Sequence, residues 1–180
     1  MKNRTTALIA TAVLSLAAGG AWAQAASAPV KLTHQDSSFL KDAAEAGNAE
    51  VEGSRLAESR TQNADVKSFA QMMVDDHTKA GDELKNLAQE KGVKVSDKPS
   101  LTKQAEIKLL SKAKDASFDK HYVNTIGVKA HEDTIKLFQK EIAKGKDADI
   151  KAWASKTLPT LQHHLEAANT LKAKTDAEKK

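Results

Sequence analysis

Four long stretches of this chain repeat apolar residues at the period of an α-helix. In each stretch an apolar or small residue recurs every three or four positions, as in a helix that packs through one face. Only 4% of the residues are aromatic, and Ala, Lys, Leu and Glu are abundant, which favours helices over sheets. The stretches run from about Leu40 to Ala57, Ala64 to Lys91, Ala116 to Lys144 and Asp147 to Leu171. They predict an all-α, antiparallel four-helix bundle, because each apolar stripe needs a packing partner.

Short polar residues and glycines mark the ends of these helices. Asp36-Ser37-Ser38 offers N-cap side chains to the first helix, and Asn63 offers one to the second. Gly92 suits the left-handed position after the second helix, and the polar segment that follows it connects the two halves of the bundle. A short extra helix, from about Leu101 to Ala113, is expected before the third long helix.

Two residues interrupt the helical pattern without ending it. Gly47 lies in the first helix, where it costs about 1 kcal/mol of helix propensity against Ala. It is expected to permit the close approach of a neighbouring helix. Pro159 lies inside the fourth helix, removes one backbone donor and predicts a kink there.

The N-terminal segment has the pattern of a secretory signal peptide. Lys2 and Arg4 precede an apolar stretch at residues 7–18, which is too short to span a bilayer. Ala21-Trp22-Ala23 then matches the small-x-small cleavage pattern. We expect residues 1–23 to be a signal peptide cleaved after Ala23, leaving no transmembrane segment in the mature chain. The sequence therefore predicts an exported, periplasmic protein.

The mature chain divides into three parts by composition. Residues 24–35 form a polar leader that is expected to be flexible. Residues 36–173 form the four-helix bundle domain, and residues 174–180 form a lysine-rich tail. A chain of roughly 150 residues is long enough to bury one ordinary core.

Charge and missing residue types exclude several classes of function. The formal net charge of +4 falls to +2 once Lys2 and Arg4 leave with the signal peptide, which argues against a nucleic-acid partner. The absence of cysteine excludes disulfides, thiolate metal sites and cysteine nucleophiles. The chain has no Gly-x-Ser-x-Gly, phosphate-binding glycine loop or His-Glu-x-x-His motif. No enzymatic reaction is predicted, and partners and oligomeric state stay open.

Each of the four stripes carries one ionisable residue near its middle. These residues are Glu50, His77, His131 and His164. A helix turns about 100° per residue, so Glu50 shares a face with Ala43 and Ala57, and the three histidines are placed in the same way. Antiparallel neighbours bring mid-helix residues to similar depth, so the four side chains are expected to meet in the core. Such a cluster predicts a site for one transition-metal ion, either zinc, iron, copper or nickel.

The same four residues have a second interpretation. A buried Glu can pair with a protonated His, and another His can donate to a backbone carbonyl, so that the cluster only specifies packing. The residues alone leave both interpretations open. His163 points about 100° away from the packed face and is expected to flank the site. Nearby acidic residues are expected on solvated faces, namely Asp75, Asp76, Glu132 and Glu166.

Several motifs occur in an order and spacing that match a known family. They are Phe39 to Ala57 with Glu50-Val51-Glu52, Phe69 to Thr78 with Asp75-Asp76-His77, Phe118-Asp119 with Tyr122, His131, and Leu158-Pro159 with His164-Leu165. From about Asp36 to Leu171 the chain resembles the bacterial family called domain of unknown function 4142. The resemblance implies an exported, ferritin-like four-helix bundle whose biochemical function is not established. It also implies that the four ionisable residues are the family's recurring polar core positions.

The sequence departs from the di-iron pattern of ferritin-like proteins. Those proteins use a Glu from each of two helices and Glu-x-x-His from each of the other two. Here Val74 stands three positions before His77, and Leu161 stands three before His164. A carboxylate-bridged di-iron centre is therefore not expected. The sequence predicts an exported bundle that binds one metal ion, or alternatively a structural or stress-related envelope protein whose buried cluster fixes the packing.

Overall fold

Residues 32–177, the part of the chain that the computed structural model describes, fold into seven consecutive helical segments. These are α1 (His34–Arg60), α2 (Ala64–Glu90), α3 (Leu101–Ser111), α4 (Asp115–Tyr122), the π-helix η1 (Val123–Ala130), α5 (His131–Lys144) and α6 (Ala148–Ala177). α4, η1 and α5 follow one another without a break, so together they form the third long helix. The predicted signal peptide, most of the predicted leader and the last three residues of the predicted tail lie outside the described residues.

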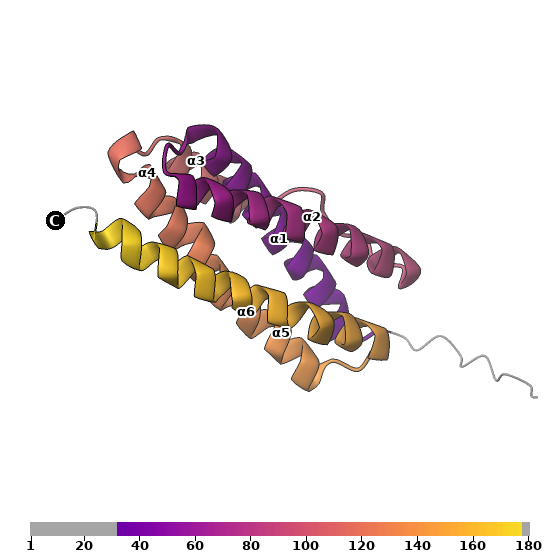
Figure 1. Cartoon of the computed structure of the whole chain (residues 1–180). Coiled ribbons are helices and arrows are strands. Elements are labelled where there is room, and N and C mark those ends of the chain that lie inside the picture. The colour runs from indigo at the N-terminus through magenta and orange to yellow at the C-terminus, as the bar shows by residue number, and fades with distance from the viewer. Residues whose placement is uncertain (1–31, 178–180) are drawn as a thin grey trace, which may run out of the picture.

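The bundle consists of two helical hairpins that pack against each other (Figure 1). α1 lies along α2, and α5 lies along α6, while contacts of α1 with α5 and of α6 with η1 and α2 close the bundle. The short helix α3 packs against α1. The described residues form no strand, and none of their helices is long and apolar enough to cross a membrane. The predicted all-α four-helix bundle with a short helix before the third long helix is confirmed.

The first helix begins at His34, two residues earlier than the predicted capping segment. Thr33 is the N-cap residue: its hydroxyl accepts from the backbone N–H of Asp36 at 3.2 Å, and the Asp36 carboxylate accepts from the backbone N–H of Thr33 at 3.1 Å. None of the predicted candidates Asp36, Ser37 and Ser38 is the N-cap residue, although Asp36 takes part in the capping box as its N3 residue. Its buried carboxylate also accepts from the backbone N–H groups of Lys146 and Asp147, which ties the start of α1 to the α5–α6 turn.

The predicted ends of α2 agree with the structure. The Asn63 side chain accepts from two backbone N–H groups in the first turn of α2. Gly92 has a φ of 68°, the left-handed conformation expected after α2. α6 continues through Pro159 as one helix and extends into the predicted lysine-rich tail as far as Ala177. Thr175 is buried near this end, so the last turns of α6 still pack on the bundle.

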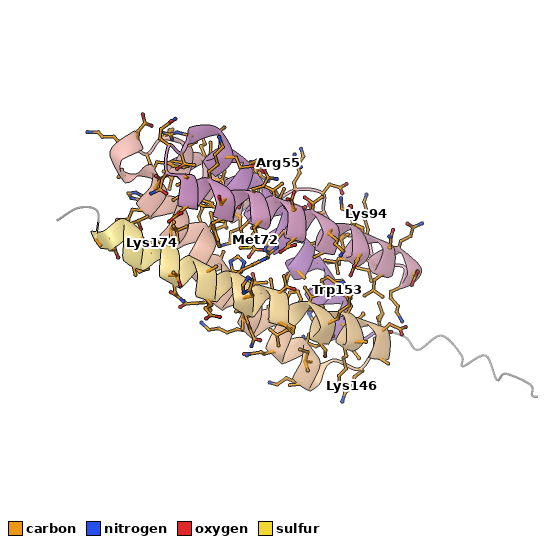
Figure 2. The ribbon with its side chains drawn as sticks, viewed as in Figure 1. Arg55, Met72, Lys94, Lys146, Trp153 and Lys174 are labelled. Carbon is orange, nitrogen blue, oxygen red and sulfur yellow. The ribbon has the colours of Figure 1, made fainter. Side chains whose placement is uncertain are left out.

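The apolar interior is divided into two clusters. One cluster lies toward the α5–α6 turn, and its large members are Phe39, Leu84, Phe138, Ile150 and Trp153. The other lies toward the α1–α2 turn, and its large members are Phe69, Met73, Phe118, Tyr122 and Ile126. Figure 2 places Trp153 between α6 and the α1–α2 pair. His77 follows Met73 and precedes Leu84 on α2, so a polar layer separates the two clusters.

Two glycines allow η1 to pack closely in the bundle, although Gly47 is not one of them. A Cβ added at Gly53 would lie 2.9 Å from the Ile126 side chain, and one added at Gly127 would lie 3.0 Å from Cβ of Ala168. A side chain at either position would require its neighbour to shift, so glycine at these positions lets α1 and α6 lie close to η1. A Cβ at Gly47 would meet no atom within 4 Å. The prediction of a close helix approach at Gly47 was therefore wrong.

Candidate metal centre

Three histidines from three helices meet in the polar layer. His77 comes from α2, His131 is the first residue of α5, and His164 comes from α6; all three are buried. Nε2 of His77 lies 3.3 Å from Nε2 of His131 and 3.2 Å from Nδ1 of His164. One ligand nitrogen of each ring lies within 4.8 Å of the others. We call these three residues the His cluster.

The spacing of these nitrogens matches coordination of a single ion. Zinc-bound histidine nitrogens lie about 2.0–2.1 Å from the metal, usually in tetrahedral geometry. Two nitrogens at that bond length and a tetrahedral angle are about 3.3 Å apart. The nitrogen–nitrogen distances of 3.3 and 3.2 Å in the His cluster are close to this value. One ion can therefore contact all three rings without a large rearrangement.

The second ring nitrogen of two histidines has a partner that only accepts hydrogen bonds. Nδ1 of His131 donates to the carbonyl oxygen of Ile126 at 3.1 Å, and Nε2 of His164 donates to the carboxylate of Asp76 at 2.9 Å. Each neutral imidazole carries one proton, so these bonds place the proton on the outer nitrogen. The inner nitrogens of both rings then present lone pairs toward His77. This arrangement is typical of histidine ligands held in place by neighbouring groups.

The π-helix η1 supplies the carbonyl that orients His131. η1 ends directly before His131, whose backbone N–H bonds to the carbonyl of Val128. The carbonyl of Ile126, five residues before His131, accepts a hydrogen bond from the imidazole. Short π-helical segments in α-helices frequently occur at functional sites. Here the irregular backbone gives His131 a fixed tautomer and orientation.

Glu50 contacts the outer side of the His cluster. Its Oε2 lies 3.1 Å from Nδ1 of His77, without hydrogen-bond alignment, and its Oε1 accepts from the hydroxyl of Thr134 at 3.2 Å. Nδ1 of His131 lies 3.8 Å from Oε1. The carboxyl group therefore faces the nitrogens that point away from the centre of the cluster. Glu50, predicted as a fourth metal ligand, is not among the residues whose ligand atoms converge.

Burial sets the protonation of the site. It raises the pKa of Glu50 to about 8, against the smaller lowering effects of the Thr134 hydrogen bond and the Lys103 charge. Burial also lowers the pKa of His131 to about 4 and lowers the pKa of His77 well below its usual range. For His164 burial lowers the pKa more than Asp76 raises it. The imidazoles are therefore neutral at pH 7, which is the form that binds metals.

Two residues that contact the site were not recognised from the sequence. Asp76 was expected on a solvated face, and this prediction was wrong because its half-exposed carboxylate pairs with His164. Thr134 lies three residues after His131, on the same helical face, and this spacing is the signal that identifies it. The neighbouring Asp75 is exposed and accepts from the side chain of Gln71, in agreement with the prediction. His163 is exposed and flanks the cluster, with its ring centroid 6.4 Å from that of His164.

The family comparison agrees with the motifs in the sequence. A family model described as Domain of unknown function (DUF4142) matches residues 21–171. The chain belongs to this family. No curated protein gives a significant match to the chain. The description of this family names no function, so the role of the His cluster is argued from its geometry.

Two solved structures have a similar fold at low sequence identity. The DUF305 fragment from Deinococcus radiodurans aligns with a TM-score of 0.71 and 11% identity, over 81% of this chain and 99% of that one. A conserved hypothetical protein, rv2844, from Mycobacterium tuberculosis aligns with a TM-score of 0.62 and 15% identity, over 77% of this chain and 91% of that one. At these identities the likeness concerns the fold alone.

The buried carboxyl group predicts a pH-dependent difference between the wild type and Glu50→Gln. Because the pKa of Glu50 is raised from 4.5 to about 8, the folded protein binds more protons than the unfolded chain between these values. The free energy of unfolding of the wild type therefore falls as pH rises through this window. The glutamine variant has no titrating group at this position, so its free energy of unfolding lacks this decrease. In urea titrations with a chelator, we expect the variant to gain about 1 kcal/mol or more over the wild type between pH 5 and pH 9, in the window set by these pKa values.

The exposed Glu52 on the same helix provides the control for this measurement. Glu52→Gln should keep a constant difference from the wild type across the pH range. A constant difference for Glu50→Gln as well would show that Glu50 keeps an ordinary pKa in the folded protein.

Proposed function

We propose that this protein binds one transition-metal ion in the centre of its bundle, through Nε2 of His77, Nε2 of His131 and Nδ1 of His164. Two observations support the proposal: Nε2 of His77 lies 3.3 and 3.2 Å from the nitrogens of His131 and His164, and one ligand nitrogen of each ring lies within 4.8 Å of the others. Imidazole ligands suit zinc, copper, nickel and iron. Three histidines leave the fourth position of a tetrahedral ion to another ligand, and the carboxylate of Asp76 holds the ring of His164.

The proton arrangement of the His cluster favours a cation over a purely structural role. The inner nitrogens of His131 and His164 both present lone pairs toward Nε2 of His77. A proton on Nε2 of His77 can be donated to only one of them, so one buried acceptor would stay unpaired. One metal ion satisfies all three nitrogens at once.

A second candidate function is a structural or stress-related envelope protein whose polar layer only specifies the packing. Nitrogen contacts of 3.2 and 3.3 Å also permit N–H···N hydrogen bonds between neutral imidazoles, which favours this alternative. A buried polar layer can fix helix register without adding much stability. In that case added metal would leave the unfolding temperature unchanged.

The two candidates are separated by metal analysis of protein purified without a histidine tag. We expect one bound ion per chain in the wild type, and loss of that ion in His77→Ala and His131→Ala, because each variant removes one of three ligands. His163→Ala is the matched control, since this exposed histidine lies beside His164 but outside the cluster. A metal at about 100 times its Kd should also raise the free energy of unfolding of the wild type by about 2.7 kcal/mol. Substoichiometric metal that both cluster variants retain would support the structural alternative.

Asp76 is expected to tune the affinity of the site without being a ligand. Its carboxylate holds the outer nitrogen of His164 at 2.9 Å, and loss of such a partner typically weakens metal binding about 10–100-fold. Asp76→Asn should therefore raise the Kd by that factor in a competition titration and keep the stoichiometry. Asp75→Asn, one residue away on the exposed face, should bind as the wild type does. Equal affinities for the two variants would exclude a supporting role for Asp76.

The N-terminal pattern supports export to the periplasm. Residues 1–23 combine the basic start, the short apolar stretch and the cleavage pattern of a signal peptide, followed by a leader at residues 24–35. The bundle would then act outside the cytoplasm, where its lack of cysteine makes it insensitive to oxidation of thiols. N-terminal sequencing of the protein from a periplasmic extract should start at Gln24. An intact N-terminus in the cytoplasmic fraction would contradict export.

A further inference from the structure

Two glycines stand in the middle of helices without a steric reason. Gly47 in α1 and Gly81 in α2 are half-buried, and a Cβ added at either position would meet no atom within 4 Å. Glycine inside a helix costs about 0.5–1 kcal/mol relative to alanine. Packing therefore does not explain these residues, in contrast to Gly53 and Gly127, where a Cβ would collide with neighbours.

Both glycines line the same cavity. It has a volume of about 40 Å³, and its wall includes Gly47, Gly81, Trp153 and Leu161, with Asn48 and Lys85 also contributing polar side chains. Glu50, His77 and Thr134 also line it. A water molecule needs about 10–15 Å³ of such space, so the cavity has room for one to three water molecules. Side chains at both glycine positions would reduce this space.

The cavity contains a buried carboxyl oxygen that has no hydrogen-bond partner. Glu50 is only 1% exposed, and its Oε2 makes no hydrogen bond in the protein. Nδ1 of His77, although 3.1 Å away, is not aligned with it. A buried polar atom without a hydrogen-bond partner costs about 1–3 kcal/mol, so such an atom in a polar cavity indicates a small bound molecule.

A second cavity reaches the same carboxyl group from the other side. It has a volume of about 140 Å³, lies between α1 and the third long helix, and has Lys103 and Asp133 among its lining residues. Glu50 and Thr134 line both cavities. The side chains of these two residues therefore lie between two spaces, on the side of His77 that faces away from the other two histidines.

We propose that Gly47 and Gly81 keep open a port, the cavity between them, for one small, uncharged hydrogen-bonding molecule, water in the resting protein, which binds Oε2 of Glu50. The glycines remove bulk where the cavity needs space, the small volume of the cavity admits only small molecules, and Oε2 of Glu50 supplies the hydrogen-bonding atom. The port opens beside Glu50, on the outer side of the His cluster, so a solvent molecule can reach Glu50 without displacing a ligand nitrogen. This inference goes beyond metal binding, because the cavity and the free oxygen belong to the metal-free chain.

The port is tested by filling it in the full metal-free chain. Gly47→Leu/Gly81→Leu adds bulk at both positions where a Cβ meets no neighbour. A high-resolution crystal structure of the wild type should contain an ordered water about 2.7–3.0 Å from Oε2 of Glu50, and the double variant should lack it. In ¹⁵N-histidine-labelled protein, hydrogen exchange of the His77 ring N–H should slow about tenfold in the double variant, because water no longer reaches this site.

Two further variants keep the test decisive. Ala105→Leu adds a leucine on the exposed face of α3, outside this cavity, and should exchange as the wild type does. Gly47→Ala/Gly81→Ala should raise the free energy of unfolding by roughly 1–2 kcal/mol through helix propensity. This alanine variant replaces the leucine variant in the same measurements if the leucine variant does not fold. Absence of the water in the wild type, or equal His77 exchange in wild type and folded double variant, would overturn the port. Those results would not contradict metal binding by the three histidines. Equally, a failure to bind metal would not contradict the port.

Discussion

Three imidazoles are buried in the middle of this bundle, so their ring nitrogens need hydrogen-bond or metal partners in place of water. A buried polar group without a partner costs about 1–3 kcal/mol. The outer nitrogens face a carboxyl group on α1, a carbonyl in η1 and a carboxylate on α2. Rotation or sliding of any of these segments would separate at least one of these contacts. The polar layer therefore fixes the rotation and depth of the helices, which apolar packing specifies less strictly.

The rest of the architecture accommodates this layer. The two apolar clusters lie on either side of it, and their large residues fill the space that the polar side chains do not. η1 departs from α-helical geometry where its backbone serves His131, and Gly53 and Gly127 give that irregular segment space against α1 and α6. Asp36 holds the far end of the bundle, where it joins the start of α1 to the α5–α6 turn. Local irregularities thus occur where polar groups need partners.

The sequence predicted the helices and the residues of the polar layer because both depend on a simple period. Apolar stripes and their central Glu50, His77, His131 and His164 can be identified from a turn of about 100° per residue. The direction in which each ring nitrogen points depends on side-chain torsions and on neighbouring helices, so the place of Glu50 behind His77 was not predictable. The pairing of Asp76 with His164 likewise depends on how α2 and α6 cross. A π-helix has no distinct sequence period in an apolar stretch, so η1 was missed.

The large sequence separation between the three histidines has a consequence for folding kinetics. His77 lies 54 residues from His131 and 87 residues from His164, so their contacts are long-range. Such contacts require closure of long loops and raise the contact order, which slows folding. α5 and α6 can bring two of the rings together within one hairpin, and the third arrives only when the other hairpin docks. The His cluster is therefore complete only after the two hairpins have docked, because neither hairpin alone contains all three histidines.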